Sequence, residues 1–261
     1  MSSLQIEILP VLNDNYMYLL RDPATGVVGV VDPPVAGPVL ERLAELDWRG
    51  KQGEIDWILS THHHPDHTAG NLELKERTGC QVAGPAAERE RIPGIDVALS
   101  EGDLFSLGER AARIFDTPGH TAGHISYWFD DSQALFCADT LFALGCGRLF
   151  EGSAEQMWLS LQKLLALPNE TLVYCGHEYT LSNARFATSI DPDNSALAAR
   201  AAEVEKRRQA GEPTVPSRLG EEKATNPFLR PFDEGIRSRL GMQEADDAEV
   251  FGEIRRRKDE A

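Results

Sequence analysis

The stretch Thr61-His62-His63-His64-Pro65-Asp66-His67 places four imidazoles and one carboxylate within seven residues, directly after the apolar run 55–59. Imidazole nitrogens and carboxylate oxygens are common ligands of first-row metals. A turn that leaves a buried strand can direct His62 and His64 into one cavity, while Asp66 and His67 face a neighbouring point. The spacing therefore predicts two metal ions rather than one.

The other histidines lie in similar local contexts. The chain has seven histidines, and those outside the cluster are His120, His124 and His177. His120 and His177 each follow an apolar run, 111–115 and 171–174, and are each directly preceded by a glycine, which lets the backbone turn sharply. Asp139 ends a further apolar run, 134–138, where a carboxylate is costly to bury unless it is paired or bound to a metal. These residues are therefore further candidate ligands.

Composition limits the class of protein. With 261 residues, 41% hydrophobic and 26% charged, the chain is long enough for one large domain or a large and a small one. Its net charge of −16 argues against nucleic acid or an anionic membrane as the main partner. Residues 1–7 lack the features of a secretory signal, and no apolar run approaches the roughly 20 residues of a membrane span. We expect a cytoplasmic protein with reduced cysteines.

Hydrophobic periodicity predicts two regions. Residues 4–8, 16–20 and 27–31 are typical of strands, and residues 39–46 and 157–165 are typical of amphipathic helices. Past His177 we expect helices at 183–190, 194–210 and 245–261, and no convincing strand. An α/β catalytic domain, 1–177, with sheets flanked by helices and a small α-helical domain, 178–261, is therefore predicted.

Several motifs carry a family resemblance. His62, His64, Asp66 and His67 match the His-x-His-x-Asp-His loop of the metallo-β-lactamase superfamily. Over nearly the whole chain the sequence resembles the glyoxalase II, or hydroxyacylglutathione hydrolase, family. The similar segments are 117–124, Gly145-Cys146-Gly147-Arg148, 175–180 and Asn226-Pro227-Phe228-Leu229-Arg230. The resemblance implies an αββα sandwich followed by a small helical domain.

The resemblance also implies a ligand set for two divalent metal ions, with zinc expected and iron or manganese as alternatives. One ion would be bound by His62, His64 and His120, the other by Asp66, His67 and His177, and Asp139 would bridge them. His63 and His124 match positions that are not ligands in the family, so we expect orienting hydrogen bonds or packing from them.

The substrate-binding positions implied by the family are Arg148, Phe150, Tyr179, Arg255 and Lys258. Arg148 stands where lysine is common, which keeps the charge but changes the donor geometry. Phe150 stands where tyrosine is common, so a hydroxyl hydrogen bond to the glutathione peptide is missing. From composition alone the basic run 255–258 is a solvated helix end; the resemblance favours substrate binding instead.

The implied activity is hydrolysis of S-D-lactoylglutathione and related glutathione thioesters to D-lactate and glutathione, as in methylglyoxal detoxification. A hydroxide between the two metals would attack the thioester, and Asp66 and Asp139 would place the metals and orient it. The chain is expected to be a monomer. The alternative is a glutathione persulfide dioxygenase of the same fold, which uses a single iron; the intact set Asp66, His67 and His177 disfavours it. A nuclease, a β-lactamase and a purely binding protein fit the sequence less well.

Overall fold

The computed structural model describes residues 3–261, and the chain divides into two compact units. Unit 1 comprises the residues up to Asp116 together with Ala122–Cys137, and unit 2 comprises Thr117–Thr121 and Ala138–Ala261. Met1 and Ser2, which belong to the stretch used above to assess a secretory signal, lie outside the described residues.

Unit 1 contains a sheet whose strands follow one another in chain order. They are β1 (Gln5–Val11), β2 (Asn15–Arg21), β3 (Val28–Val31), β4 (Trp57–Leu59), β5 (Gln81–Pro85) and β6 (Val97–Leu99). The pairs β1–β2 and β2–β3 are antiparallel, whereas β3–β4, β4–β5 and β5–β6 are parallel. The carboxyl ends of β3 and β4 therefore meet at one edge, with Val31 opposite Leu59.

The part of the second, six-stranded sheet that lies in unit 1 is an antiparallel meander. Its strands are β7 (Leu104–Leu107), β8 (Arg110–Asp116), β9 (Ile125–Phe129) and β10 (Ala134–Ala138). The two sheets pack face to face, because the Trp57 and Phe105 rings meet edge to face at 5.0 Å and the Tyr18 and Phe136 rings lie 5.5 Å apart.

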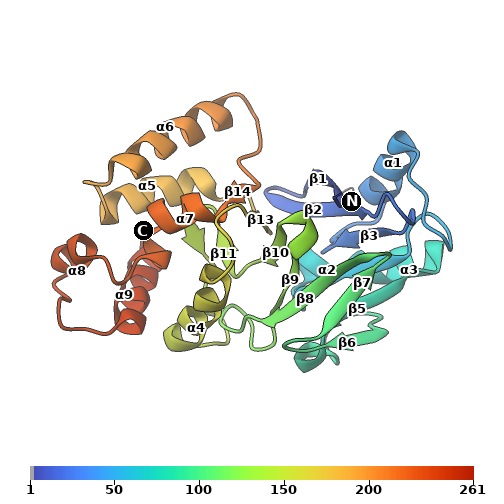
Figure 1. The fold of residues 1–261 in the computed structure, drawn as a ribbon, viewed down its shortest axis with the longest axis horizontal. Helices are drawn as coiled ribbons and strands as arrows, with labels where there is room; N and C mark the ends of the chain where they lie inside the picture. Colours follow the sequence, from blue (N-terminus) through green and yellow to red (C-terminus); the bar gives the residue numbers. More distant parts are fainter. Residues whose placement is uncertain (1–2) are drawn as a thin grey trace. The chain divides into compact units, whose positions relative to one another are not determined.

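Helices of unit 1 cover the first sheet. They are α1 (Gly37–Leu46), α2 (Pro65–Thr68) and α3 (Asn71–Thr78), and Figure 1 shows α1 and α3 beside β3 and β5. Val39 and Leu43 of α1 and Leu74 of α3 are fully buried in one apolar cluster with Val30 and Ile58 of the sheet. Burial of these side chains fixes the strands that lead into the histidine loop.

Unit 2 combines short strands with helices. Its elements are β11 (Leu141–Phe142), β12 (Gly145–Cys146), α4 (Ala154–Leu165), β13 (Leu172–Cys175), α5 (Thr180–Ile190), α6 (Ser195–Gln209), β14 (Ser217–Arg218), α7 (Leu219–Thr225), α8 (Glu234–Leu240) and α9 (Asp247–Asp259). Helices α5 and α6 run side by side (Figure 1), and Ala184, Ala187, Leu197 and Val204 enclose Leu144, which precedes β12.

The architecture agrees with the α/β class and helical C-terminal region expected from the sequence. One expectation was wrong: a strand does follow His177, because β14 pairs antiparallel with β13. It spans only Ser217–Arg218 and is too short for any alternation of polar and apolar residues to show. Among the described residues, the helices are too short or too polar to cross a membrane.

Candidate metal centre

The histidine loop of unit 1 is anchored by Asp32, which directly follows β3. Its two carboxylate oxygens accept the Thr61 N–H at 2.8 Å and the Thr61 hydroxyl at 2.7 Å. Asp32 has a φ of 49°, an uncommon conformation for a residue other than glycine. Because β3 and β4 are parallel neighbours, Asp32 and Thr61 lie at the same edge of the sheet, where the loop begins.

Within unit 1 the predicted ligands approach one another in pairs. His62 Nε2 lies 3.2 Å from His64 Nδ1, and His67 Nε2 lies 3.5 Å from Asp66 Oδ2. Two ligand atoms about 2.05 Å from a tetrahedral ion are roughly 3.3 Å apart, so both separations suit a shared metal. The turn of α2 brings Asp66 and His67 together, and Asn15 Nδ2 donates to Asp66 Oδ2 at 3.1 Å.

His63 and His124 have other contacts. His63 Nδ1 donates to Glu88 Oε2 at 2.8 Å, and the other Glu88 oxygen accepts the Gly123 N–H at 3.0 Å. The His124 ring stacks on His62, with centroids 4.8 Å apart and planes 20° apart. His63 thus hydrogen-bonds to Glu88, and His124 packs against a candidate ligand.

The predicted ligands of unit 2 gather around Asp139, directly after β10. Its Oδ2 lies 3.3 Å from His120 Nε2 and 3.4 Å from His177 Nε2. Both separations again match two ligands of one ion. One carboxylate oxygen therefore faces two imidazoles that were assigned to different metals, which is the arrangement that a bridging carboxylate requires.

The backbone of unit 2 fixes these three side chains. The His120 Nδ1–H donates to the Arg148 carbonyl at 2.9 Å, which fixes the tautomer and leaves the lone pair of Nε2 on the side of Asp139. The Gly176 N–H donates to the Ala138 carbonyl at 3.0 Å, so the residues before His177 and Asp139 are tied together. A side chain at Gly147 would meet the Asp139 carbonyl at 1.8 Å, hence only glycine fits there.

The aromatic residues expected at the substrate site lie beside two of these ligands. The Phe150 ring is 5.1 Å from the His120 ring, and it is 61% exposed. The Tyr179 ring stacks on His177 at 4.7 Å, with planes 1° apart. Both aromatic side chains thus combine a contact to a candidate ligand with an exposed face.

The three expected cations form a cluster with different degrees of burial. Burial lowers the pKa of Lys258, and the charges of Arg255 and Arg148 lower it further. Arg148 is exposed, whereas Arg255 is buried and donates to the Cys146 carbonyl at 2.9 Å. Lys258 also borders a groove of about 510 Å³ that includes Tyr179 and Arg185.

Sequence reasoning did not identify Asp32 and Glu88 as parts of the site. Asp32 stands 3.4 Å from His67 Nδ1, and Glu88 is 2% exposed beneath His63. Asp32 carried the same signal as Asp139, an acidic residue at the end of an apolar strand. Glu88 is followed by the charged residues 89–91, and no alternation of polar and apolar residues in this segment indicates that the Glu88 side chain is buried.

Two family models together span nearly all of the chain. Residues 13–177 match the metallo-beta-lactamase superfamily, and residues 178–261 match the hydroxyacylglutathione hydrolase C-terminus.

Individual proteins give the same result. The chain is 60% identical to a hydroxyacylglutathione hydrolase of Methylococcus capsulatus and 55% identical to one of Rhodospirillum rubrum, with 98% and 99% of both chains covered. Among solved structures, ETHE1 from Myxococcus xanthus is 27% identical, with a TM-score of 0.68 over 97% of this chain and 90% of that one. The protein has histidine and aspartate groups compatible with a binuclear metal site, and it belongs to the hydroxyacylglutathione hydrolase family of the metallo-β-lactamase superfamily.

Proposed function

We propose that this protein is a binuclear metal-dependent thioester hydrolase that converts S-D-lactoylglutathione and related glutathione thioesters to glutathione and the free acid. The single observation that carries the proposal is Asp139 Oδ2, which lies 3.3 Å and 3.4 Å from His120 Nε2 and His177 Nε2. A carboxylate between two imidazoles of different predicted ligand sets supports two adjacent metal ions. The names of the relatives at 55–60% identity support the substrate class.

In the proposed ligand set, His62, His64 and His120 would hold one ion, Asp66, His67 and His177 would hold the other, and Asp139 would contribute to both. When bound, two such ions lower the pKa of water and polarise a carbonyl oxygen. Asp66 and Asp139 would orient the attacking water as hydrogen-bond acceptors, so that the thioester carbonyl is hydrolysed to the free acid and glutathione leaves as its thiolate. Burial raises the pKa of Cys175 to about 12, so this thiol stays neutral and is a poor nucleophile near neutral pH.

The glutathione end of the substrate carries carboxylates, which suit the cluster of Arg148, Arg255 and Lys258. We propose that Lys258 and Arg148 contact the substrate together with Tyr179 and Phe150. Arg255 contributes less positive charge than the other two, because it is buried, bonded to the Cys146 carbonyl and paired with Asp259 at 2.7 Å. In a protein of net charge −16, this cluster attracts an anion that the rest of the surface repels.

The test is steady-state hydrolysis of S-D-lactoylglutathione by metal-loaded protein, followed through loss of the thioester absorbance. His64→Ala and Asp139→Ala remove one candidate ligand each, and Asp193→Ala, whose side chain is 90% exposed, is the control. We expect turnover in the wild type and in Asp193→Ala, and a loss of at least about 100-fold in the two ligand variants. Absence of thioester loss, with oxygen uptake on glutathione persulfide, would overturn the assignment in favour of the dioxygenase.

Several finer properties belong to the same proposal. Nitrogen and oxygen donors without thiolate suit zinc, iron and manganese, and we propose zinc, to be checked by elemental analysis. Two metal ions per chain are expected. We also propose a cytoplasmic monomer, with residues 1–177 as the catalytic domain and 178–261 as the substrate-binding domain.

A further inference from the structure

The hairpin formed by β11 and β12 links the two halves of the site in unit 2. It starts two residues after Asp139 and ends two residues before Arg148, whose carbonyl holds His120. Gly147 closes the hairpin by donating its N–H to the Thr140 carbonyl at 3.3 Å. Any shift of the hairpin therefore moves the support of His120 and the backbone beside Asp139.

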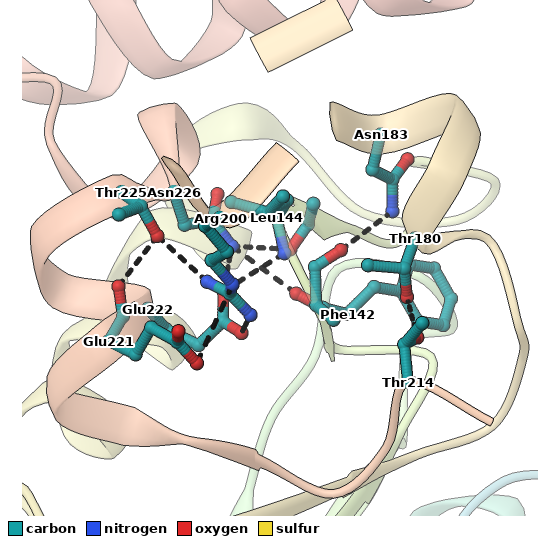
Figure 2. A network of polar contacts seen from close by, with 12 residues as sticks. Phe142, Leu144, Thr180, Asn183, Arg200, Thr214, Glu221, Glu222, Thr225 and Asn226 are labelled. Carbon is teal, nitrogen blue, oxygen red and sulfur yellow. Dashed lines mark hydrogen bonds and ion pairs between the residues drawn. The ribbon is translucent and has the colours of Figure 1, made fainter. Parts of the chain in front are cut away.

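Side chains from the region beyond residue 178 form hydrogen bonds with the backbone of each residue from Phe142 to Gly145 in this hairpin (Figure 2). Asn226 Nδ2 donates to the Phe142 carbonyl at 3.2 Å and to the Gly145 carbonyl at 3.0 Å. Asn183 Nδ2 donates to the Ala143 carbonyl at 3.1 Å. Glu222 Oε2 accepts the Leu144 N–H at 2.9 Å. Leu144 has a φ of 57°, so the turn contains a strained residue that its partners keep in place.

A buried ion pair holds Glu222 in turn. Arg200 of α6 donates to Glu222 Oε1 and, at 2.7 Å, to the Thr225 hydroxyl. Glu222 is fully buried and Arg200 is 8% exposed. Two charges removed from water in this way stabilise a protein little compared with apolar residues of the same size, so their value lies in the geometry that they impose.

We infer that Glu222, Arg200, Asn226 and Asn183 are positioning residues for the metal centre, acting through the β11–β12 hairpin on His120 and Asp139. Glu222 supplies the acceptor that keeps Leu144 in its strained conformation, and Arg200 fixes the rotamer of Glu222. The inference rests on the proposed function only for the presence of a metal at His120 and Asp139. Outer partners of this kind change metal affinity without touching the ion.

The experiment separates positioning from stability with two double variants. E222M/R200M removes both buried charges and the acceptor, whereas E222Q/R200M removes the charges but keeps a carbonyl oxygen that can accept the Leu144 N–H. R237M/D247M, which deletes the ion pair between α8 and α9, is the control within the same unit. Zinc affinity is measured by chelator competition without substrate, and the unfolding temperature is recorded for each metal-stripped protein.

We expect E222M/R200M to bind zinc about tenfold more weakly than the wild type and E222Q/R200M to recover most of that loss. The variants E222M/R200M and E222Q/R200M should unfold at temperatures similar to each other. The control R237M/D247M should bind zinc within about twofold of the wild-type affinity. Equal zinc affinity in E222M/R200M and the wild type would overturn the inference. So would equally weakened binding in both double variants, since the acceptor would then have no role.

A milder variant covers the case in which E222M/R200M fails to fold. N183A removes one hydrogen bond to the turn and leaves the ion pair intact. It should fold and bind zinc a few times more weakly; unchanged zinc affinity in N183A would count against the inference. Because zinc binding is read without substrate, a failure of thioester hydrolysis leaves this result interpretable by itself.

Discussion

The carboxylate of Asp32 contacts two residues of the histidine loop at the candidate metal centre. It holds Thr61 through two hydrogen bonds and stands 3.4 Å from His67 Nδ1. Asp32→Ala should weaken metal binding about 10–100-fold, because the histidine loop loses its anchor and His67 loses its orienting partner. Chelator competition measures the effect, with Asp193→Ala as the control. A lowered unfolding temperature with unchanged metal affinity would mean that Asp32 serves the fold alone.

Lys258 gives a residue-level prediction for the substrate. Its ammonium donates to Ser182 Oγ at 3.0 Å and lies 5.3 Å from the Phe186 ring centre, so it is held near the cationic cluster. Lys258→Met should raise KM for the thioester about tenfold and change kcat little, since we propose that Lys258 contacts a part of the substrate remote from the reacting carbonyl. Lys206→Met, on the exposed surface of α6, should leave KM unchanged. A fall in kcat at constant KM would exclude this role.

At the scale of elements, Asp22 joins the turn after β2 to the turn between β7 and β8. Burial alone would raise the pKa of Asp22, but hydrogen bonds from the Glu109 N–H, Thr25, the Ala24 N–H and Arg110 outweigh it and lower the pKa to about 2. A carboxylate with a lowered pKa in the folded state stabilises the protein above its ordinary pKa of 3.8 and loses this contribution as the pH falls towards 2.

The expected contribution of Asp22 near neutral pH is about 2 kcal/mol. Asp22→Asn should therefore lower the free energy of unfolding by this amount at pH 7, and the difference from the wild type should shrink between pH 4 and pH 2. Urea unfolding of both proteins at a series of pH values measures it, with the exposed Asp47→Asn as the control. A difference that stays constant down to pH 2 would show that the charge of Asp22 is not the cause.

Elements with strong periodicity could be predicted from the sequence, and short ones could not. The run 134–138 is β10 at its full length, and the helix expected at 157–165 lies within α4, whose capping box at Ser153 sets its start. β6 (Val97–Leu99) and β14 were not predicted, because two or three residues carry no alternation. Their places are set by tertiary pairing with β5 and β13.

The candidate site shows the same division. The histidines and Asp139 could be identified as candidate ligands from the sequence, because their residue types bind metals and each lies at or near the end of an apolar run. Asp32 and Glu88 needed the structure, since each acts on a residue about 25 to 30 positions away. The turn network of Glu222 and Asn226 is more distant still, reaching across 78 positions to Leu144 and 81 to Gly145.

For the whole molecule, the family boundary and the structural units fall at different places. The family models meet between residues 177 and 178, whereas unit 2 runs without interruption from Ala138 to Ala261. The chain beyond residue 178 supplies all the side chains described above that hold residues 142–146: Asn183, Glu222 and Arg255 from helices, and Asn226, which follows α7. The region that matches the superfamily model therefore ends inside a compact unit.

A fragment of residues 1–177 should consequently fail to fold cooperatively. It loses the five hydrogen bonds to the hairpin described above, about 1 kcal/mol each, and exposes Leu144, which packs against α5 and α6. That sum of about 5 kcal/mol is comparable to the 5–15 kcal/mol that holds a typical protein folded. Near-UV circular dichroism and thermal melting of the fragment measure the effect, and adding residues 178–261 as a separate chain should restore a sharp transition. A cooperative transition close to that of the full chain, with two metal ions bound, would show instead that residues 142–146 hold their conformation without the helices.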